Sequence, residues 1–173
     1  WQNSLSLWNH VICHYPRVAI AFNNRGNILN ERGEFDAAIA DFNRAVELDP
    51  LNANVYNNRG FAFNGKKDHA RALADFSRAI ELDPSFADAY LNLGAMLCEA
   101  RHCDAAMALY DSAIVACPKS ALIRFNRAVA LEDLGRIEEA VSSYELSLNL
   151  DPALADAHFN IARLKELLSD SQS

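Results

Sequence analysis

The sequence lacks an apolar run long enough to cross a bilayer, and it has no basic start followed by an apolar segment typical of a secretory leader. Basic residues are also scarce, because 16 Lys and Arg stand against 23 Asp and Glu and give a net charge of −7. Nucleic acids and anionic membrane surfaces are bound mainly through Lys and Arg. We therefore expect neither nucleic acid nor a membrane surface as a partner of this chain.

Cysteine is scarce as well, and no two cysteines form a CxxC pair. A chain of 173 residues can bury a core of its own, so it does not need a disulfide framework. We interpret the four cysteines as reduced packing residues. They are Cys13, Cys98, Cys103 and Cys117.

The five prolines recur at a spacing of 34 residues. They are Pro16, Pro50, Pro84, Pro118 and Pro152. A fixed period of this length indicates that one supersecondary unit is repeated along the chain.

Small and aromatic residues follow the same period when repeats are counted from Ala19, Ala53, Ala87 and Ala121. The eighth residue is Gly26, Gly60, Gly94 or Ala128, and the twenty-fourth is Phe42, Phe76, Tyr110 or Tyr144. Apolar residues recur at spacings of three and four within each half of a repeat, which predicts two amphipathic helices. We expect the small residue where the two helices cross closely, the aromatic residue beside it, and the proline after the second helix. Helices of about 14 residues are too short to be stable alone, so the pairs must stack into an all-α solenoid.

The strings AFNNRGNILNERGEFDAAIADFNRAVELDP and VYNNRGFAFNGKKDHARALADFSRAIELDP resemble the tetratricopeptide repeat (TPR). They share an aromatic residue at position 4, Gly at 8, Ala at 20, an aromatic residue at 24, Ala at 27 and Pro at 32. The resemblance covers residues 19–154. It implies an α-α superhelix, a right-handed solenoid of antiparallel helix pairs, whose concave face binds a protein or peptide partner.

This pattern predicts four full repeats and two terminal segments. The repeats are 19–52, 53–86, 87–120 and 121–154, and residues 155–173 form a capping helix and tail. Residues 1–18 align with the second helix of a preceding repeat, so we expect the chain to be a fragment of a longer protein. An apolar face that lacks its usual cover favours self-association, and the predicted homo-oligomer contact comprises Trp1, Leu5, Trp8 and Ile12.

Asparagine occupies the sixth position of every first helix, at Asn24, Asn58, Asn92, Asn126 and Asn160. In the resembled family this position faces the concave groove. An amide donates and accepts hydrogen bonds, so it can bind a peptide backbone without recognising its side chains. We therefore predict a partner-binding groove that is polar at Asn23, Asn27 and Asn57 and apolar at Leu91, Phe125 and Val129. The alternative is that these amides only connect one repeat to the next.

No motif predicts catalysis, a metal or a cofactor. The segment GFAFNGKK lacks the hydroxyl residue that a phosphate-binding loop needs, and its glycine start falls within a predicted helix. Two sets have the spacing of metal ligands on a helix, but neither supplies four ligands. The first set is His10, Cys13 and His14, and the second set is Cys98, His102 and Cys103.

The sequence thus predicts a non-enzymatic scaffold that binds an extended partner segment through the asparagine ladder. One alternative is a regulatory or substrate-presenting region of a larger enzyme, membrane-anchored or not, whose catalytic part is absent here. Another is an architectural module that stacks end to end. The sequence does not indicate a compartment.

Overall fold

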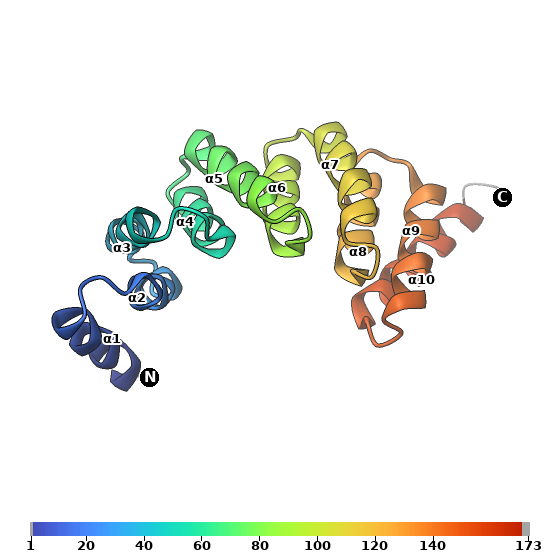
Figure 1. Cartoon of the computed structure of the whole chain (residues 1–173). Coiled ribbons are helices and arrows are strands. Elements are labelled where there is room, and N and C mark those ends of the chain that lie inside the picture. The colour runs from blue at the N-terminus through green and yellow to red at the C-terminus, as the bar shows by residue number, and fades with distance from the viewer. Residues whose placement is uncertain (1, 171–173) are drawn as a thin grey trace. The chain divides into compact units, whose positions relative to one another are not determined.

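The computed structural model describes residues 2–170, and α-helix is the regular secondary structure found among them. The ten helices are α1 (Gln2–His14), α2 (Ala19–Glu31), α3 (Phe35–Leu48), α4 (Ala53–Gly65), α5 (His69–Leu82), α6 (Ala87–Glu99), α7 (Cys103–Ala116), α8 (Ala121–Asp133), α9 (Ile137–Leu150) and α10 (Ala155–Asp170) (Figure 1). The predicted all-α fold is confirmed. Over residues 2–170, no helix has the length and apolar character needed to cross a membrane.

The periodic prolines lie in the loops that follow α1, α3, α5, α7 and α9. Proline lacks a backbone N–H and cannot continue a helix, so each one separates a helix pair from the next pair. Their predicted place after the second helix of each pair is confirmed.

The turn inside each helix pair contains one residue with a positive φ, again every 34 residues. Gly33 and Gly135 adopt φ values of 74° and 71°, which glycine tolerates without a Cβ clash. Lys67 and Arg101 adopt 63° at the equivalent positions, where a side chain is disfavoured. Gly65 lies two residues before this position and ends α4.

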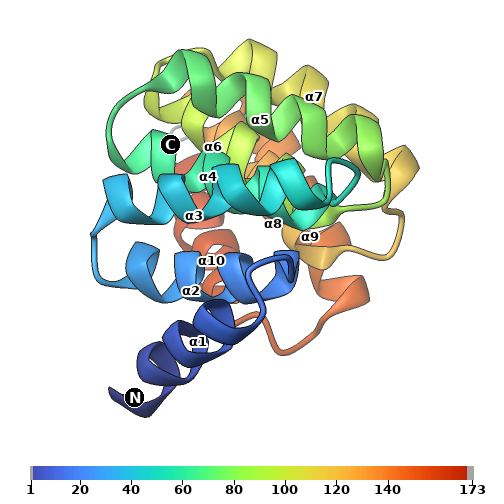
Figure 2. The ribbon, with the colours of Figure 1, turned by 60° about the vertical axis from the view of Figure 1, so that its left-hand side comes forward.

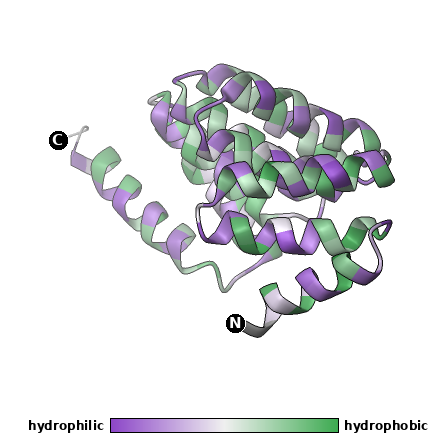
Figure 3. Ribbon diagram, turned by 90° about the vertical axis from the view of Figure 1, so that its left-hand side faces the viewer, coloured by the Kyte–Doolittle hydropathy of each residue, from purple (hydrophilic) through white to green (hydrophobic). Residues whose placement is uncertain are grey.

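The helices form two compact units, Trp1–Ala89 (unit 1) and Tyr90–Ser173 (unit 2), and the boundary falls within α6. In unit 1, α2 packs against α1, α3 and α4, and α4 also packs against α3 and α5 (Figure 2). In unit 2, α8 packs against α7 and α9, and α9 packs against α10. Each helix carries both hydrophilic and hydrophobic residues, as expected for helices that are amphipathic (Figure 3).

Each unit buries the aromatic residue that the repeat pattern places on its second helices. In unit 1, Phe42 and Phe76 are at most 1% exposed, and in unit 2 Tyr110 and Tyr144 are also at most 1% exposed. On α10, Leu164 is 1% exposed, so this terminal helix contributes to the core of unit 2.

The small residues lie where the two helices of a pair approach most closely. A Cβ added to Gly26 would lie 2.6 Å from the Phe42 ring, and one added to Gly60 would lie 2.9 Å from the Phe76 ring. A Cβ on Gly94 would overlap the Tyr110 ring still more. The prediction of a close crossing filled by the neighbouring aromatic residue is confirmed.

Candidate partner-binding grooves

A groove between α2 and α4 in unit 1 gathers amide side chains, and we refer to it as the amide groove. Its volume is about 540 Å³. It is lined by Ala19, Ile20, Asn23, Asn24, Asn27, Asp49, Asn52, Asn54, Val55 and Asn58. Six of these ten residues are asparagines, and Asp49 is the one charged residue among them. The groove therefore offers many neutral donors and acceptors and little net charge.

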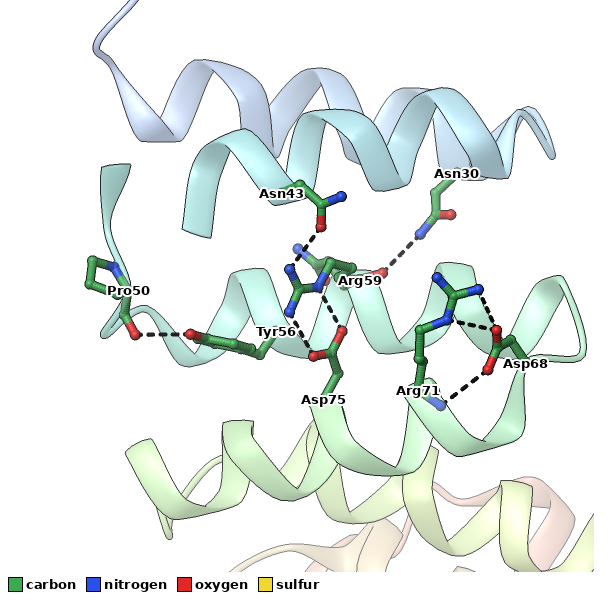
Figure 4. Close-up of polar contacts among 9 residues, drawn as sticks. Asn30, Asn43, Pro50, Tyr56, Arg59, Asp68, Arg71 and Asp75 are labelled. Atoms are coloured by element: carbon green, nitrogen blue, oxygen red, sulfur yellow. Dashed lines mark hydrogen bonds and ion pairs between the residues drawn. The ribbon is translucent and has the colours of Figure 1, made fainter. Parts of the chain in front are cut away.

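Amide side chains also form hydrogen bonds between the two helices of the groove. The Nδ2 of Asn58 donates to the Oδ1 of Asn23 at 3.1 Å. The Nδ2 of Asn30 donates to the backbone carbonyl of Asn58 at 3.3 Å, from the same pair of helices (Figure 4). The amides of α2 and α4 thus connect the two repeats, and Asn23 and Asn58 line the groove as well.

A second hollow of about 310 Å³ adjoins the amide groove between α1 and α2. It is lined by Ser4, Trp8, Asn24, Asn27, Ile28, Glu31 and Arg32. Asn24 and Asn27 belong to both linings, so the two hollows share a wall. Trp8 and Ile28 make this hollow more apolar than its neighbour.

The later asparagines of the ladder have other surroundings. In unit 2 the Nδ2 of Asn126 donates to the carbonyl of Leu122 at 2.9 Å, on its own helix. The Nδ2 of Asn160 donates to the Tyr144 hydroxyl at 3.0 Å. Asn92 is half-buried on α6. The five asparagines are therefore equivalent in sequence but make different contacts.

The remaining predicted groove residues differ in exposure. Asn57 is 7% exposed, and Leu91 is half-buried. The half-buried Phe125 ring packs against Tyr144, with 5.2 Å between the ring centroids. Val129 lines a cleft in unit 2 together with Asn126.

The predicted self-association face lies on α1, except for Trp1, which is outside the described residues. Leu5 and Ile12 are partly buried against a cluster in unit 1 that includes Phe22 and Leu29. Trp8 lines the hollow between α1 and α2. Part of this face is therefore covered by α2, and self-association stays a prediction.

An arginine clamp in each of the first two repeats was not predicted from the sequence. Arg59 donates from Nε and Nη2 to the two carboxylate oxygens of Asp75, at 2.7 and 2.8 Å (Figure 4). Its Nη1 donates to Asn43 Oδ1 at 2.8 Å, on the helix that precedes α4. The hydrogen bonds to Asp75 raise the pKa of Arg59.

The same clamp occurs one repeat earlier, where Arg25 donates to both oxygens of Asp41 and to Asn9. The hydrogen bonds to Asp41 likewise raise the pKa of Arg25. The signal was available in the sequence, because both the arginines and the aspartates are 34 residues apart. These clamps connect neighbouring helices within unit 1.

A cleft of about 690 Å³ in unit 2, which we refer to as the thiol cleft, contains two of the four cysteines. It is lined by Ala95, Cys98, Glu99, Arg101, Cys103, Asp104, Tyr110, Asn126, Val129, Asp133 and Leu134. Burial, together with the neighbouring Cys103 and Asp133, raises the pKa of Cys98 to about 12. The third ligand-bearing side chain beside the two thiols is Asp133 of α8. His102, which shares the helical spacing of the two cysteines, is not part of this group of three.

The other set with metal-ligand spacing forms contacts within α1. The Nδ1 of His14 lies 2.9 Å from the carbonyl of His10, and the two imidazole rings are tilted by 37° with centroids 4.1 Å apart. Cys13 is exposed.

Three models of known protein families together match most of the helical region. One family described as "TPR repeat" matches residues 26–67, and families described as "Tetratricopeptide repeat" match residues 53–86 and 97–158. The chain is therefore a tetratricopeptide-repeat protein. Comparison with curated protein sequences gave no match.

Solved structures of other TPR proteins have the same helical solenoid fold. YrrB, described as a TPR protein with an unusual peptide-binding site, is 24% identical, with 94% of this chain and 84% of YrrB covered at a TM-score of 0.68. TTC0263 of Thermus thermophilus is 21% identical, with 92% and 88% covered at a TM-score of 0.74. MamA is 24% identical, with 88% and 89% covered at a TM-score of 0.73. The repeat fold is that of a protein-interaction scaffold and is generally non-catalytic.

Proposed function

We propose that this chain is a non-catalytic scaffold that binds an extended segment of a partner protein in the amide groove of unit 1. The observation that supports this proposal is the convergence of six asparagines from two repeats on one groove. Asparagine is a mediocre helix former, so propensity does not explain so many of them on α2 and α4.

The chemistry of the groove suits a peptide backbone. Each amide offers a carbonyl acceptor and an NH₂ donor, which are the complements of the backbone N–H and C=O groups. An extended chain rises about 3.3 Å per residue, so a few consecutive residues would pass several of these amides. Since Asp49 is the one charged residue that lines the amide groove, we expect the affinity contributed by this groove to depend weakly on salt.

The hollow between α1 and α2 supplies an apolar subsite. Asn24 and Asn27 line both hollows, so one ligand could span them while its backbone stays beside these two amides. Trp8 and Ile28 would then contact an apolar side chain of the ligand. We infer a ligand with one apolar anchor next to a stretch recognised through its backbone.

The described peptide-binding site of the similar protein YrrB supports the same class of ligand. Neutral hydrogen bonds contribute about 0.5–1.5 kcal/mol each, so a few of them plus one apolar anchor predict micromolar affinity. The contribution of Asn92, Asn126, Asn160, Leu91, Phe125 and Val129 to partner binding stays a prediction.

A peptide array tests the proposal, with peptides selected by the wild-type chain and then measured by isothermal titration. The test variant is Asn24→Ala combined with Asn27→Ala, which removes the two amides that both hollows share. The loss of two hydrogen bonds should weaken binding about tenfold or more. The matched control is Ser142→Ala combined with Asn149→Ala, two exposed positions on α9.

Equal binding by the test variant and the wild type would contradict the amide groove as the binding site. The remaining interpretation would then be that the asparagines connect repeats. A Trp8→Ala variant distinguishes the two subsites. It should lower the affinity for peptides that carry an apolar anchor and leave the affinity for peptides without one unchanged.

A further inference from the structure

Three side chains in unit 2 bring potential metal ligands together, at a place separate from the amide groove. Cys98 lies in the last turn of α6, Cys103 begins α7, and Asp133 ends α8. One ligand atom from each residue lies within 4.8 Å of the other two. The Sγ of Cys103 lies 4.0 Å from the Oδ2 of Asp133.

We propose that Cys98, Cys103 and Asp133 form a binding site for one Zn²⁺ ion or a similar thiophilic divalent cation. Two thiolates and a carboxylate are ligands that Zn²⁺ commonly takes, and a water molecule completes the four-coordinate shell. The proposal is independent of peptide binding. It revises the interpretation of Cys98 and Cys103 as packing residues.

The separation of Cys103 Sγ and Asp133 Oδ2, 4.0 Å, is close to the one that a tetrahedral ion imposes. Bonds of about 2.3 Å to sulfur and 2.0–2.2 Å to oxygen place those two ligand atoms about 3.5 Å apart. The distance between the sulfur of Cys103 and the carboxylate oxygen of Asp133 would therefore shorten by about 0.5 Å. Cys103 is 7% exposed and fixed in the core, whereas Asp133 is exposed and can rotate toward the ion.

The backbone between the two cysteines is already held in a tight turn. The amide N–H of Arg101 donates to the carbonyl of Cys98 at 2.9 Å, and that of His102 donates to the carbonyl of Leu97 at 2.8 Å. Arg101 adopts the positive φ described above, which reverses the chain so that Cys103 returns toward Cys98. Four residues separate the cysteines, a spacing found in structural zinc sites.

The thiol cleft gives the ion space for its fourth ligand and a favourable charge. Besides the three proposed ligands, Glu99, Asp104 and Arg101 line the cleft. Together with the ligand Asp133, these make three carboxylates against one guanidinium, a balance that attracts a cation. A volume of about 690 Å³ leaves ample room for a water ligand.

An ion at this position would connect three helices of unit 2. It would link the turn between α6 and α7 to the end of α8, and so join two consecutive helix pairs. Because an unfolded chain does not hold these ligands together, binding would stabilise the folded state.

The test uses the full 173-residue chain, reduced and freed of metal by a chelator, and titrated with Zn²⁺ alone or Co²⁺ alone. We expect one equivalent of Zn²⁺ to bind and to raise the temperature of thermal unfolding. Co²⁺ should produce a thiolate charge-transfer band in the near ultraviolet. Cys98→Ser leaves one thiolate and should reduce both the intensity of the band and the affinity for Zn²⁺. Asp133→Asn removes a direct ligand and should weaken Zn²⁺ binding by at least the roughly 10- to 100-fold that follows the loss of a residue that only supports a ligand.

The matched control is Cys13→Ser combined with Cys117→Ser, which should keep the affinity and the band of the wild type. Because Cys103 is buried, Cys103→Ala is first checked for wild-type helicity by circular dichroism. Unchanged Zn²⁺ affinity in Cys98→Ser would overturn the proposal, as would a reduced wild type that binds no Zn²⁺. Formation of a Cys98–Cys103 disulfide in a protein whose reduced form does not bind Zn²⁺ would also overturn it.

Discussion

Units 1 and 2 stabilise equivalent helix positions with different chemistry. In unit 1 the seventh residue of each repeat is an arginine clamped to an aspartate whose side chain is at most 9% exposed. In unit 2, Leu93 takes the place of the arginine in the third repeat and is 4% exposed, with Leu109 in the place of the aspartate. In the fourth repeat Arg127 pairs with the exposed Asp111 of the preceding helix instead. The equivalent positions thus accept a part-buried ion pair, two leucines, or an arginine paired with an exposed carboxylate.

The asparagine ladder differs between the units in a similar way. In unit 1, Asn24 and Asn58 lie in one groove with four further amides. In unit 2, Asn126 bonds to its own helix and Asn160 bonds to a tyrosine hydroxyl. The same residue at the same repeat position therefore does not produce the same site, because its neighbours decide where the amide is directed.

The largest expected effect comes from breaking a clamp in unit 1. Asp75→Ala removes the partner of Arg59, whose side chain is only 17% exposed, and leaves a largely desolvated guanidinium. We expect a loss of about 2–3 kcal/mol in the free energy of unfolding. Urea denaturation followed by circular dichroism measures this change.

The double variant Arg59→Leu with Asp75→Leu serves as its control, because it installs the leucines that occupy these positions in the third repeat. Its unfolding free energy should lie within about 1 kcal/mol of the wild type, since replacing both ions avoids an unpaired charge. A double variant less stable than Asp75→Ala alone would contradict this explanation of the difference between the units.

The second-largest effect on stability is expected at the close helix crossings. Gly94→Ala forces a methyl group into the Tyr110 ring, whereas in Gly60→Ala the added Cβ lies 2.9 Å from the Phe76 ring. Overpacking costs about 1–3 kcal/mol, and the better helix propensity of alanine returns about 1 kcal/mol. We expect a net loss of about 1–2 kcal/mol for Gly94→Ala and less for Gly60→Ala. Thermal denaturation of the two variants side by side checks the order, and the reverse order would refute it.

A smaller effect of opposite sign is expected at the turns with positive φ. Lys67→Gly relieves a left-handed residue at an exposed position and should stabilise the protein by about 0.5–1 kcal/mol. Gly33→Ala introduces that cost at the equivalent turn and should destabilise by a similar amount. Urea midpoints measure both changes, and equal signs for the two variants would rule out this explanation.

The smallest effect is expected for the surface ion pair of unit 2. The side chain of Asp111 is 57% exposed, so solvent screens its attraction to Arg127. Asp111→Ala should change the unfolding free energy by about 0.5 kcal/mol or less, compared with about 2–3 kcal/mol for Asp75→Ala. Equal losses of stability in the two variants would show that the two ion pairs do not differ as the exposure of their aspartates indicates.

The helices and their order were predictable because they depend on local signals. The prolines, the small residues and the aromatic residues recur at one spacing, and each acts on the helix or turn that contains it. Most of the amides that line the groove of unit 1 were predictable as well, since Asn23, Asn24, Asn27 and Asn58 lie at regular positions on first helices. The clamps were not predicted, although Arg25 and Arg59 recur with their aspartates.

By itself, the sequence determined the tetratricopeptide repeat, the all-α fold and the burial of the small and aromatic residues at the repeat positions, because a periodic pattern repeats the same local physics in every unit. Only the tertiary structure decided which asparagines share a groove and that Asp133 joins two cysteines from 30 and 35 residues earlier in the chain. Such contacts form between helices whose side chains face one another. Residue type and spacing along a single helix do not determine how far apart side chains on different helices lie.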